Sequence, residues 1–354
     1  MKDKIITFLF IAYIFIFAIF HLLIPDLEIS LSERRTLSKF PKFEFNNEYI
    51  TKVDKYLLDH FTLREELRSV KAFYNYKILN KLDNNGIYLK DDSIYKSNYP
   101  TNKKSINNFI NHIEVLKENL TNSNKVYMMI IPDKNYYLEE KDFLHIDYDY
   151  IYDQLNRIGI NNIDVRNVLN INDYYKTDTH WKQENLDKVV RQLALEMNFN
   201  YEEDEYESNI YDGFYGVYYG ESAMSFLPDK ITYLTNETLD NVTVKYLENK
   251  NLNKVYNLDK LNSMDSYEVY LDGASSFIEI FNDNVKEKRE LVIFRDSFAS
   301  SISPLLTNYY SKITLIDNRY ISSNVFNSLI EFTDQDVLFM YSTLIVNNSG
   351  SLKK

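Results

Sequence analysis

The sequence predicts an α/β fold built on a central parallel sheet, preceded by an N-terminal transmembrane helix. Residues 125–134 (KVYMMIIPDK) and 291–298 (LVIFRDSF) are nearly continuous apolar runs, which is typical of strands buried on both faces. Helical patterns alternate with such strands along the chain, as in folds with a parallel sheet. Hydrophobic residues make up 45% of the 354, with only seven Gly and six Pro, so the chain can bury a sizeable core.

The first element is a run of twenty mostly apolar residues, 5–24, which is long enough to cross a bilayer as a helix. Lys2 and Lys4 precede it, whereas Asp26 and Glu28 follow it. The positive-inside rule then leaves the N-terminus in the cytoplasm and the rest of the chain outside. The length of the run and the lack of a small-residue cleavage site favour an uncleaved signal anchor. The alternatives are secretion after cleavage of a signal peptide, or a soluble protein with a buried helix.

Periodicity predicts the elements that follow. Helices are predicted where apolar residues recur at helical spacing, at residues 49–79, 105–120, 148–158, 181–197, 299–310 and 322–331. Besides the two runs above, strands are predicted as a hairpin at 86–96, within 162–169, and at 312–317 and 336–342. Between 201 and 284 the rhythm stops, and short alternating runs rich in Tyr and Asn predict a β-rich insertion.

We therefore expect three parts. Residues 1–25 form the anchor, residues 26–100 form an extracytoplasmic stalk with a helical and hairpin lead-in, and residues 101–354 form the α/β domain with its insertion at about 201–284.

Composition excludes several classes of protein. The formal net charge is -12 and no dense stripe of Lys and Arg occurs, which argues against nucleic-acid binding. Cysteine is absent from the sequence, so disulfides, thiol catalysis and Cys-ligated zinc or iron–sulfur sites are excluded.

Ser297 stands just past a predicted strand and just before a predicted helix, in FRDSF. In an open α/β sheet, ligands bind beyond the carboxyl ends of the strands. A serine there can present its hydroxyl to solvent, while its own N–H and the start of the helix favour an oxyanion. Ser297 is therefore a candidate nucleophile, and a helix N-cap is the alternative.

Asp178 and His180, in TDTHW, supply the two groups that a nucleophilic serine requires, a base and a carboxylate that orients the base. With one residue between them, both side chains can point the same way from a loop. The alternatives are an N-cap beside a surface histidine, or two metal ligands, for which no third ligand is evident nearby. Trp181, the single tryptophan, is a candidate for the core or for stacking on a sugar ring.

The order of several motifs resembles the bacterial DHHW protein family, which is similar to the SGNH-like acetyltransferases of alginate and other exopolysaccharide systems. The motifs are SERRTLSKFPKF, YLLDHFTLREELRSVK, IIPDK, TDTHW, FRDSFASSISPLL and ITLIDNRY, and the resemblance covers essentially the whole chain after the anchor. Two positions depart from the pattern. Thr179 stands at the second position of the Asp-His-His-Trp motif, and Arg295 replaces the Gly of the Gly-Asp-Ser box, which alters the turn.

The resemblance implies a three-layer α/β/α fold, SGNH-like and flavodoxin-like, and a catalytic triad. Ser297 would be the nucleophile, His180 the general base and Asp178 the residue that orients it. It implies neither a cofactor nor a metal ion.

The resemblance also implies oxyanion donors from a Gly and an Asn on two other loops. Only Gly273 matches, and Ser275 stands about where the Asn is expected. Arg319 and Tyr341 follow the next two predicted strands and could line the same pocket. Alternatively, Arg319 is an ion-pair partner and Tyr341 is a core residue.

Three hypotheses for function follow. The first is a membrane-anchored, extracytoplasmic O-acetyltransferase or acetylesterase that acts on a cell-surface or secreted polysaccharide and receives acyl groups from a membrane-bound acyltransferase. The second is a catalytically inactive polysaccharide-binding protein, for which a Tyr- and Trp-lined groove away from Ser297 would speak. The third is an envelope assembly protein, for which an exposed apolar patch on residues 201–284 would speak.

Overall fold

A computed structural model confirms the α/β fold with a large, mostly parallel sheet that the sequence predicts. It describes residues 2–30, 32–138, 143–248 and 252–353. The chain divides into two units, which are treated separately. Unit 1 comprises Met1–Asn85 and Tyr219–Phe226, and unit 2 comprises Gly86–Tyr218 and Leu227–Lys354. The apolar N-terminal helix belongs to unit 1, and the central sheet and all predicted site residues belong to unit 2.

The central sheet of unit 2 has the strand order β10-β11-β13-β12-β14-β6-β7. Its strands from β13 to β7 run parallel, whereas β11 is antiparallel to β13 and β10 is antiparallel to β11. The strands are β6 (Lys125–Ile131), β7 (Asn161–Asn162), β10 (Thr243–Tyr246), β11 (Phe277–Phe281), β12 (Glu290–Arg295), β13 (Lys312–Ile316) and β14 (Asp336–Ser342). Because β12 lies in the middle, the loop that follows it opens at the centre of the carboxyl edge.

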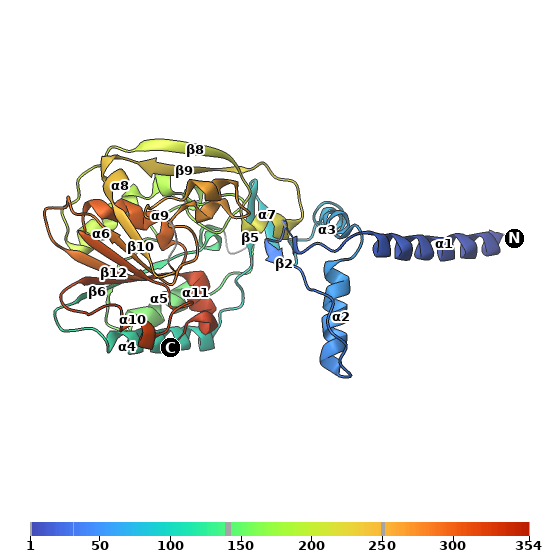
Figure 1. Ribbon diagram of the computed structural model, residues 1–354, viewed down its shortest axis with the longest axis horizontal. Coiled ribbons are helices and arrows are strands. Elements are labelled where there is room, and N and C mark those ends of the chain that lie inside the picture. The colour runs from blue at the N-terminus through green and yellow to red at the C-terminus, as the bar shows by residue number, and fades with distance from the viewer. Residues whose placement is uncertain (1, 31, 139–142, 249–251, 354) are drawn as a thin grey trace. The chain divides into compact units, whose positions relative to one another are not determined.

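Helices cover both faces of the sheet (Figure 1). In β12, Ile293 packs on one side with α6 (Asp187–Met197), whereas Phe294 packs on the other side with α4 (Lys103–Lys117) and α5 (Tyr148–Asn156). Both side chains are completely buried. This three-layer arrangement explains why the strands read as uninterrupted apolar runs.

The segment predicted as an insertion contributes to two sheets. β8 (Glu207–Phe214) and β9 (Asp229–Thr235) form a separate antiparallel hairpin, whereas β10 and β11 extend the central sheet. Two short helices, α7 (Val217–Ser222) and α8 (Glu237–Asn241), lie between these strands along the chain. The hairpin predicted at 86–96 is confirmed as β4 (Ile87–Lys90) and β5 (Ser93–Lys96).

Two predicted helices have different bounds in the structure. The helix predicted at 49–79 is divided into α2 (Asn47–Asp59), α3 (Arg64–Phe73) and a π-helical turn (Tyr74–Ile78). The division follows from Leu63, whose φ of 58° cannot continue a right-handed helix. The helix predicted from Trp181 begins only at Asp187, because Trp181 pairs with Tyr174 in an isolated β-bridge.

The helices near the C-terminus are also shorter than predicted. Residues 299–310 form α9 (Ala299–Ile302) and then a 3-10 helix (Ser303–Asn308), since Pro304 has no N–H and its ring disfavours a continuing α-helix. The helix predicted at 322–331 is reduced to α10 (Ser323–Phe326), and α11 (Thr343–Asn347) follows β14 without having been predicted.

Unit 1 begins with α1 (Lys2–Leu23), continues through the hairpin of β1 (Ile29–Ser30) and β2 (Arg35–Thr36) to α2 and α3, and includes β3 (Asp83–Asn84). Residues 2–21 of α1 have a mean hydropathy of 2.2, and none of these residues is buried. By length and composition this helix fits a membrane anchor or a signal sequence.

Ion pairs hold the β1–β2 hairpin to the corner between α2 and α3. Arg35 binds both carboxylate oxygens of Asp59, and Glu33 accepts a hydrogen bond from Arg64 at 3.0 Å and lies 3.5 Å from Arg68. The motifs SERR and LLDHFTLREELR are therefore structural partners within unit 1.

Candidate active site

Ser297 lies two residues beyond the end of β12 and is half-buried. The chain continues from β12 to β13 on one side and then to β14 on the other, so Ser297 stands at a topological switch point. Asp296 fixes this turn. One of its carboxylate oxygens accepts the N–H of Phe298, and the other accepts both the N–H and the hydroxyl of Ser342.

Asp178, His180 and Ser297 form a continuous hydrogen-bonded chain. Nδ1 of His180 lies 2.6 Å from Oδ1 of Asp178, and Nε2 lies 2.8 Å from Oγ of Ser297. With its hydrogen on Nδ1, the neutral ring can accept a proton from the serine at Nε2. The structure thus brings together three residues of which the last is 117 positions away from His180.

The carboxylate of Asp178 is buried and fully hydrogen-bonded. Its Oδ1 also accepts the N–H of His180 at 2.9 Å, and its Oδ2 accepts the N–H of Val217 at 2.8 Å. Burial alone would raise the pKa of Asp178, but His180 and these two N–H groups hold that pKa below its ordinary value. Asp178 is therefore an ionised acceptor that sets the orientation of the imidazole ring.

The N–H of Val217 reaches Asp178 because residue 216 is glycine. A Cβ on Gly216 would lie 2.3 Å from the Cβ of Asp178 and 2.4 Å from the carbonyl oxygen of Thr177. No side chain fits at those distances. The N–H of Gly216 donates to the hydroxyl of Thr177 at 2.9 Å, so two successive N–H groups hold the loop that carries Asp178.

Aromatic side chains fix the plane of the His180 ring. Tyr267 stacks on it, with ring centroids 3.9 Å apart and an interplanar angle of 8°, and Phe298 contacts it at 5.0 Å. Trp181 is fully buried and donates its indole N–H to the carbonyl of Phe298 at 3.0 Å and to the hydroxyl of Ser301 at 2.9 Å. Trp181 therefore joins the histidine loop to the serine turn and offers no surface to a sugar.

Lys134, in the IIPDK motif, is buried beside the same loop. Its amine donates to the carbonyl of Ile94 at 2.8 Å and to that of Lys176 at 3.0 Å. Burial lowers the pKa of Lys134 to about 7, whereas the nearby Asp229 and Asp178 act in the opposite direction. Lys134 thus tethers the loop that carries Asp178 to the β4–β5 hairpin.

The two predicted oxyanion donors have other partners. The N–H of Gly273 donates to the carbonyl of Tyr270 at 3.3 Å, and the hydroxyl of Ser275 donates to Glu248 at 3.1 Å. No hydrogen bond seen in the described part of the chain joins either group to the serine or the histidine.

Arg319 and Tyr341 also have structural partners. Arg319 forms a two-pronged ion pair with Asp317, with distances of 2.9 and 2.6 Å. Tyr341 is fully buried, donates to Asn318 and packs edge-on against Phe109. These contacts agree with the structural alternatives that the sequence left open for both residues.

Arg295, which departs from the Gly-Asp-Ser pattern, completes β12. Its guanidinium is buried and donates to the hydroxyl of Ser300 at 2.7 Å and to the carbonyl of Ser275 at 3.3 Å. The arginine therefore ties the strand end to the first turn of α9.

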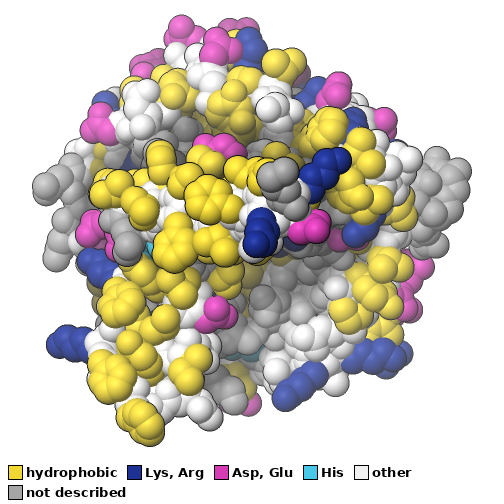
Figure 2. Space-filling view, turned by 90° about the vertical axis from the view of Figure 1, so that its right-hand side faces the viewer, with side chains coloured by type: hydrophobic (Ala, Val, Ile, Leu, Met, Phe, Trp, Pro, Cys, Tyr) yellow, Lys and Arg dark blue, Asp and Glu magenta, His cyan; other side chains and the backbone are white. Residues whose placement is uncertain are grey.

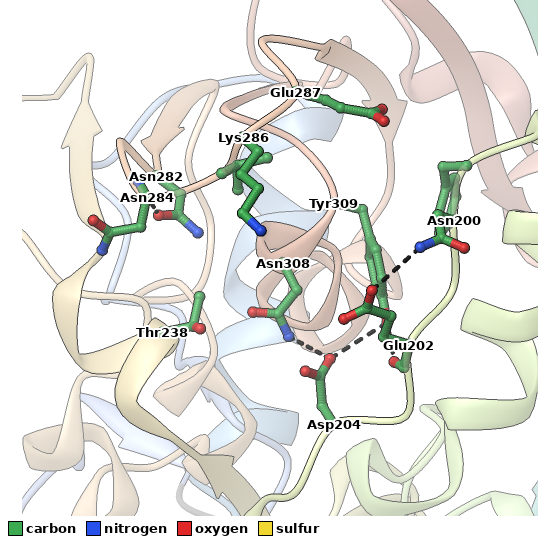
Figure 3. A pocket seen from close by; sticks show the side chains of 12 residues that line it. Asn200, Glu202, Asp204, Thr238, Asn282, Asn284, Lys286, Glu287, Asn308 and Tyr309 are labelled. Carbon is green, nitrogen blue, oxygen red and sulfur yellow. Dashed lines mark hydrogen bonds between the residues drawn. The ribbon is translucent and has the colours of Figure 1, made fainter.

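A polar pocket of about 350 Å³ lies at the other end of the sheet (Figure 3). It is lined by side chains such as Asn282, which follows β11, and Tyr309, which precedes β13, so it opens at the amino ends of the parallel strands. Asp204 within it accepts hydrogen bonds from Asn308 and Tyr309. Although acidic residues line the pocket, no group of three or more possible metal ligands occurs among the described residues. The pocket is separate from the candidate active site.

The fold of the chain is similar to that of several solved structures. No protein-family model matches the sequence, and no curated protein matches it. A DHHW family protein from Eubacterium siraeum matches with a TM-score of 0.59 and 21% identity, over 77% of this chain and 98% of that chain. Bacillus cereus PatB1, in a structure with a sulfonyl adduct, matches with a TM-score of 0.58 and 17% identity, over 73% and 95%. The O-acetyltransferase domain of Pseudomonas putida AlgJ matches with a TM-score of 0.44 and 11% identity, over 74% and 92%. The first comparison confirms the resemblance to a DHHW family protein at the level of the fold, and the second shows that PatB1 has a similar fold.

Proposed function

We propose that the chain is a membrane-anchored, extracytoplasmic O-acetyltransferase or acetylesterase with a Ser297–His180–Asp178 triad. The observation that carries this proposal is the pair of short hydrogen bonds, 2.6 and 2.8 Å, that link the carboxylate, the imidazole and the hydroxyl in that order. A serine, its base and the group that orients the base are the set that nucleophilic acyl transfer requires.

In the first step, Oγ of Ser297 forms a bond to the acyl carbon of an ester while its proton passes to Nε2 of His180. The bond between the acyl carbon and the alcohol oxygen breaks, and the alcohol leaves with that proton. In the second step, a sugar hydroxyl or a water molecule gives its proton to Nε2 and attacks the acyl carbon. The serine oxygen then leaves and recovers a proton from His180. Asp178 stabilises the imidazolium that forms in each step.

The proposed acceptor is a cell-surface or secreted polysaccharide, and the proposed acyl source is a membrane-bound acyltransferase. Both rest on the motif resemblance. The apolar α1 supports a position at the membrane, with the α/β unit outside the cytoplasm. Acetyl-CoA is a cytoplasmic donor, so an enzyme outside the cell requires acyl groups delivered through the membrane.

Two observations on the described residues bear on the other hypotheses. The large tyrosines near the site, such as Tyr175 and Tyr270, are completely buried and cannot stack on sugars. Exposed apolar side chains on the described part of residues 201–284, such as Ile210 and Leu227, are scattered along the segment.

The test is hydrolysis of 4-nitrophenyl acetate by the full chain in detergent micelles, with Ser297→Ala and the exposed-serine control Ser328→Ala. We expect the rate of Ser297→Ala to fall on the order of 10⁴-fold or to the background, and that of Ser328→Ala to stay unchanged. A sulfonyl fluoride should label the parent chain at Ser297 by mass spectrometry, a test suggested by the adduct in the PatB1 structure. Folded protein without activity or labelling would refute the enzyme and favour polysaccharide binding.

A further inference from the structure

The helix α3 and the π-helical turn after it present apolar side chains outward. Leu63, Leu67, Val70, Tyr74 and Ile78, here called the apolar stripe, follow one another at helical spacing, and each is 45–65% exposed. A helix on the surface of a soluble domain normally turns such a stripe toward its core. In α3 the apolar side chains instead point away from the core of the unit.

The opposite side of α3 faces the rest of unit 1 and carries small and polar side chains. Ala72 and Asn75 are buried there, and Asn75 donates to Asn84 at 2.8 Å. Arg68 donates to the carbonyl of Gly220 at 2.8 Å and lies within ion-pair distance of Glu33. These contacts fix the rotation of the helix, so the outward direction of the apolar stripe does not result from a free rotation of α3.

The apolar stripe begins next to the last turns of α1. The ring of Phe61 lies 5.8 Å from that of Phe17, and the hydroxyl of Thr62 lies 3.5 Å from Nδ1 of His21. Within unit 1, α2 and α3 run across the direction of α1 (Figure 1). If α1 spans a membrane, the start of the apolar stripe lies at the level where α1 leaves it.

The segment between β2 and α2 also exposes apolar side chains. Phe40, Phe43 and Phe45 are 61%, 75% and 99% exposed, and in the sequence KFPKFEF Lys39 precedes Phe40 and Lys42 lies between Phe40 and Phe43. Aromatic rings beside lysines are typical of the boundary between lipid and water. Figure 2 shows that hydrophobic side chains gather in groups on one face of the molecule.

Charge supports lipid as the surface that covers the apolar stripe. Residues 39–85 hold nine Lys and Arg against seven Asp and Glu, whereas the whole chain has a formal net charge of -12. Lys71 and Lys77 flank the stripe and can extend their amines toward phosphates while their stems lie along apolar surface. A segment of this kind fits an anionic bilayer surface better than the rest of the chain does.

We propose that the apolar stripe lies in the interfacial layer of the membrane that α1 crosses, on the side that carries unit 2. This inference rests on the anchor in the proposed function. Under it, unit 1 lies on the lipid surface as a collar around the base of α1, so that residues 26–85 do not form a free stalk.

The test uses the complete absence of cysteine from the sequence. Single cysteines are introduced into the full chain at Leu67→Cys and Val70→Cys in the stripe, at Ser69→Cys as an exposed control on the same helix, and at Ile11→Cys in α1. Each carries an environment-sensitive fluorophore, and the chain is reconstituted in nanodiscs that contain anionic phosphatidylglycerol. We expect the labels at 67, 70 and 11 to shift to the blue and to be quenched by spin-labelled lipids. The label at 69 should be quenched by aqueous iodide.

Three other outcomes are informative, and each would refute a different claim. Iodide quenching at 67 and 70 equal to that at 69 would refute the interfacial position. Protection from iodide without quenching by lipid would mean that protein, such as a second copy of the chain, covers the stripe. Loss of lipid quenching at residue 11 would refute the anchor itself. Ester hydrolysis measured on the same samples reports the catalytic proposal separately, because Ser297 is unchanged in all of them.

Discussion

The two units of the chain differ in what they bury. In unit 2, apolar side chains fill large clusters on both faces of the sheet, and β12, β13 and β14 are almost entirely buried. In unit 1, the described side chains that are buried are mostly polar: Ser30, Asp59, Thr62, Asn75, Asn84 and Ser222, beside Leu37 and Ala72. Unit 2 is thus stabilised by the hydrophobic effect, whereas unit 1 depends on ion pairs and hydrogen bonds that each contribute on the order of 1 kcal/mol.

This difference explains why the candidate chemistry is in unit 2. A serine, a histidine and an aspartate must keep their positions to within fractions of an ångström, and a close-packed core provides that rigidity. Unit 1 exposes its apolar side chains and fits a role in attachment. Changes at the site should therefore remove activity and leave the stability of unit 1 unchanged. Changes in unit 1 should alter the stability of that unit and leave activity unchanged.

Among changes that leave Asp178, His180 and Ser297 in place, the largest effect is expected from Gly216→Ala. The added Cβ would lie within 2.5 Å of Cα and Cβ of Asp178, so the loop must shift and the hydrogen bond from Val217 to the carboxylate must lengthen. We expect kcat/KM for a small acetyl ester to fall about 100-fold, because misplacement by roughly 1 Å has that effect. Gly350→Ala is the matched control, since a Cβ there meets no atom within 4 Å. Equal activity of the two variants would show that the N–H of Val217 does not orient the triad.

A smaller effect is expected from Lys134→Met, which should change how the free energy of unfolding depends on pH. The pKa of Lys134 falls from 10.5 to about 7 on burial, so between these values the unfolded chain binds more protons than the folded one. The free energy of unfolding of the parent chain should therefore gain about 2 kcal/mol from this residue between pH 7 and 9. Lys134→Met should lose that gain.

Urea unfolding at both pH values, followed by the fluorescence of Trp181, measures this, because the single tryptophan is buried in unit 2. Lys125→Met, at the exposed start of β6, is the control. A pH dependence that survives in Lys134→Met would assign the gain to another group.

Local signals predict the central sheet, and together with the motif resemblance they single out Ser297, His180 and Asp178 as candidates. Uninterrupted apolar runs identify the buried strands, and the placement of Ser297 after one of them is a matter of chain order alone. The pair Asp178 and His180 needs only a spacing of two residues, which a loop can hold in many folds.

The groups that contact the loop of Asp178 and His180 could not be predicted from local signals. Tyr267, Gly216 and Lys134 contact the histidine loop from positions up to about ninety residues away, and their neighbours along the chain carry no pattern that specifies such contacts. The predicted helix bounds are also wrong at two places. Leu63 has a left-handed backbone conformation, and Trp181 pairs with Tyr174 in a β-bridge, and neither feature follows from local periodicity. The ion pairs between the β1–β2 hairpin and the helices on either side of Leu63 are not revealed by periodicity either.

The smallest effect, and the one confined to unit 1, is expected from Arg35→Met. Its guanidinium is the main reason that the pKa of Asp59 lies below its ordinary value of 3.8, and without it the carboxylate still accepts the N–H of Ser38 at 2.9 Å. We expect unit 1 to lose about 1 kcal/mol above pH 4, since the charge-assisted hydrogen bonds from a partly exposed arginine to Asp59 are removed. Because Asp59 has a lowered pKa in the folded chain, the difference should shrink as the pH falls below about 3.8.

Hydrogen exchange of the α2 and α3 amides in nanodiscs measures this change. Lys39→Met, which removes an ion pair with Glu28 whose side chains are both more than 80% exposed, should change exchange very little. Ester hydrolysis should stay at the parent rate in both variants. Faster exchange in β12 and β14 of Arg35→Met would show that the ion pairs of unit 1 also stabilise the sheet. The two units would then differ in which side chains they bury, but they would not be stabilised independently of each other.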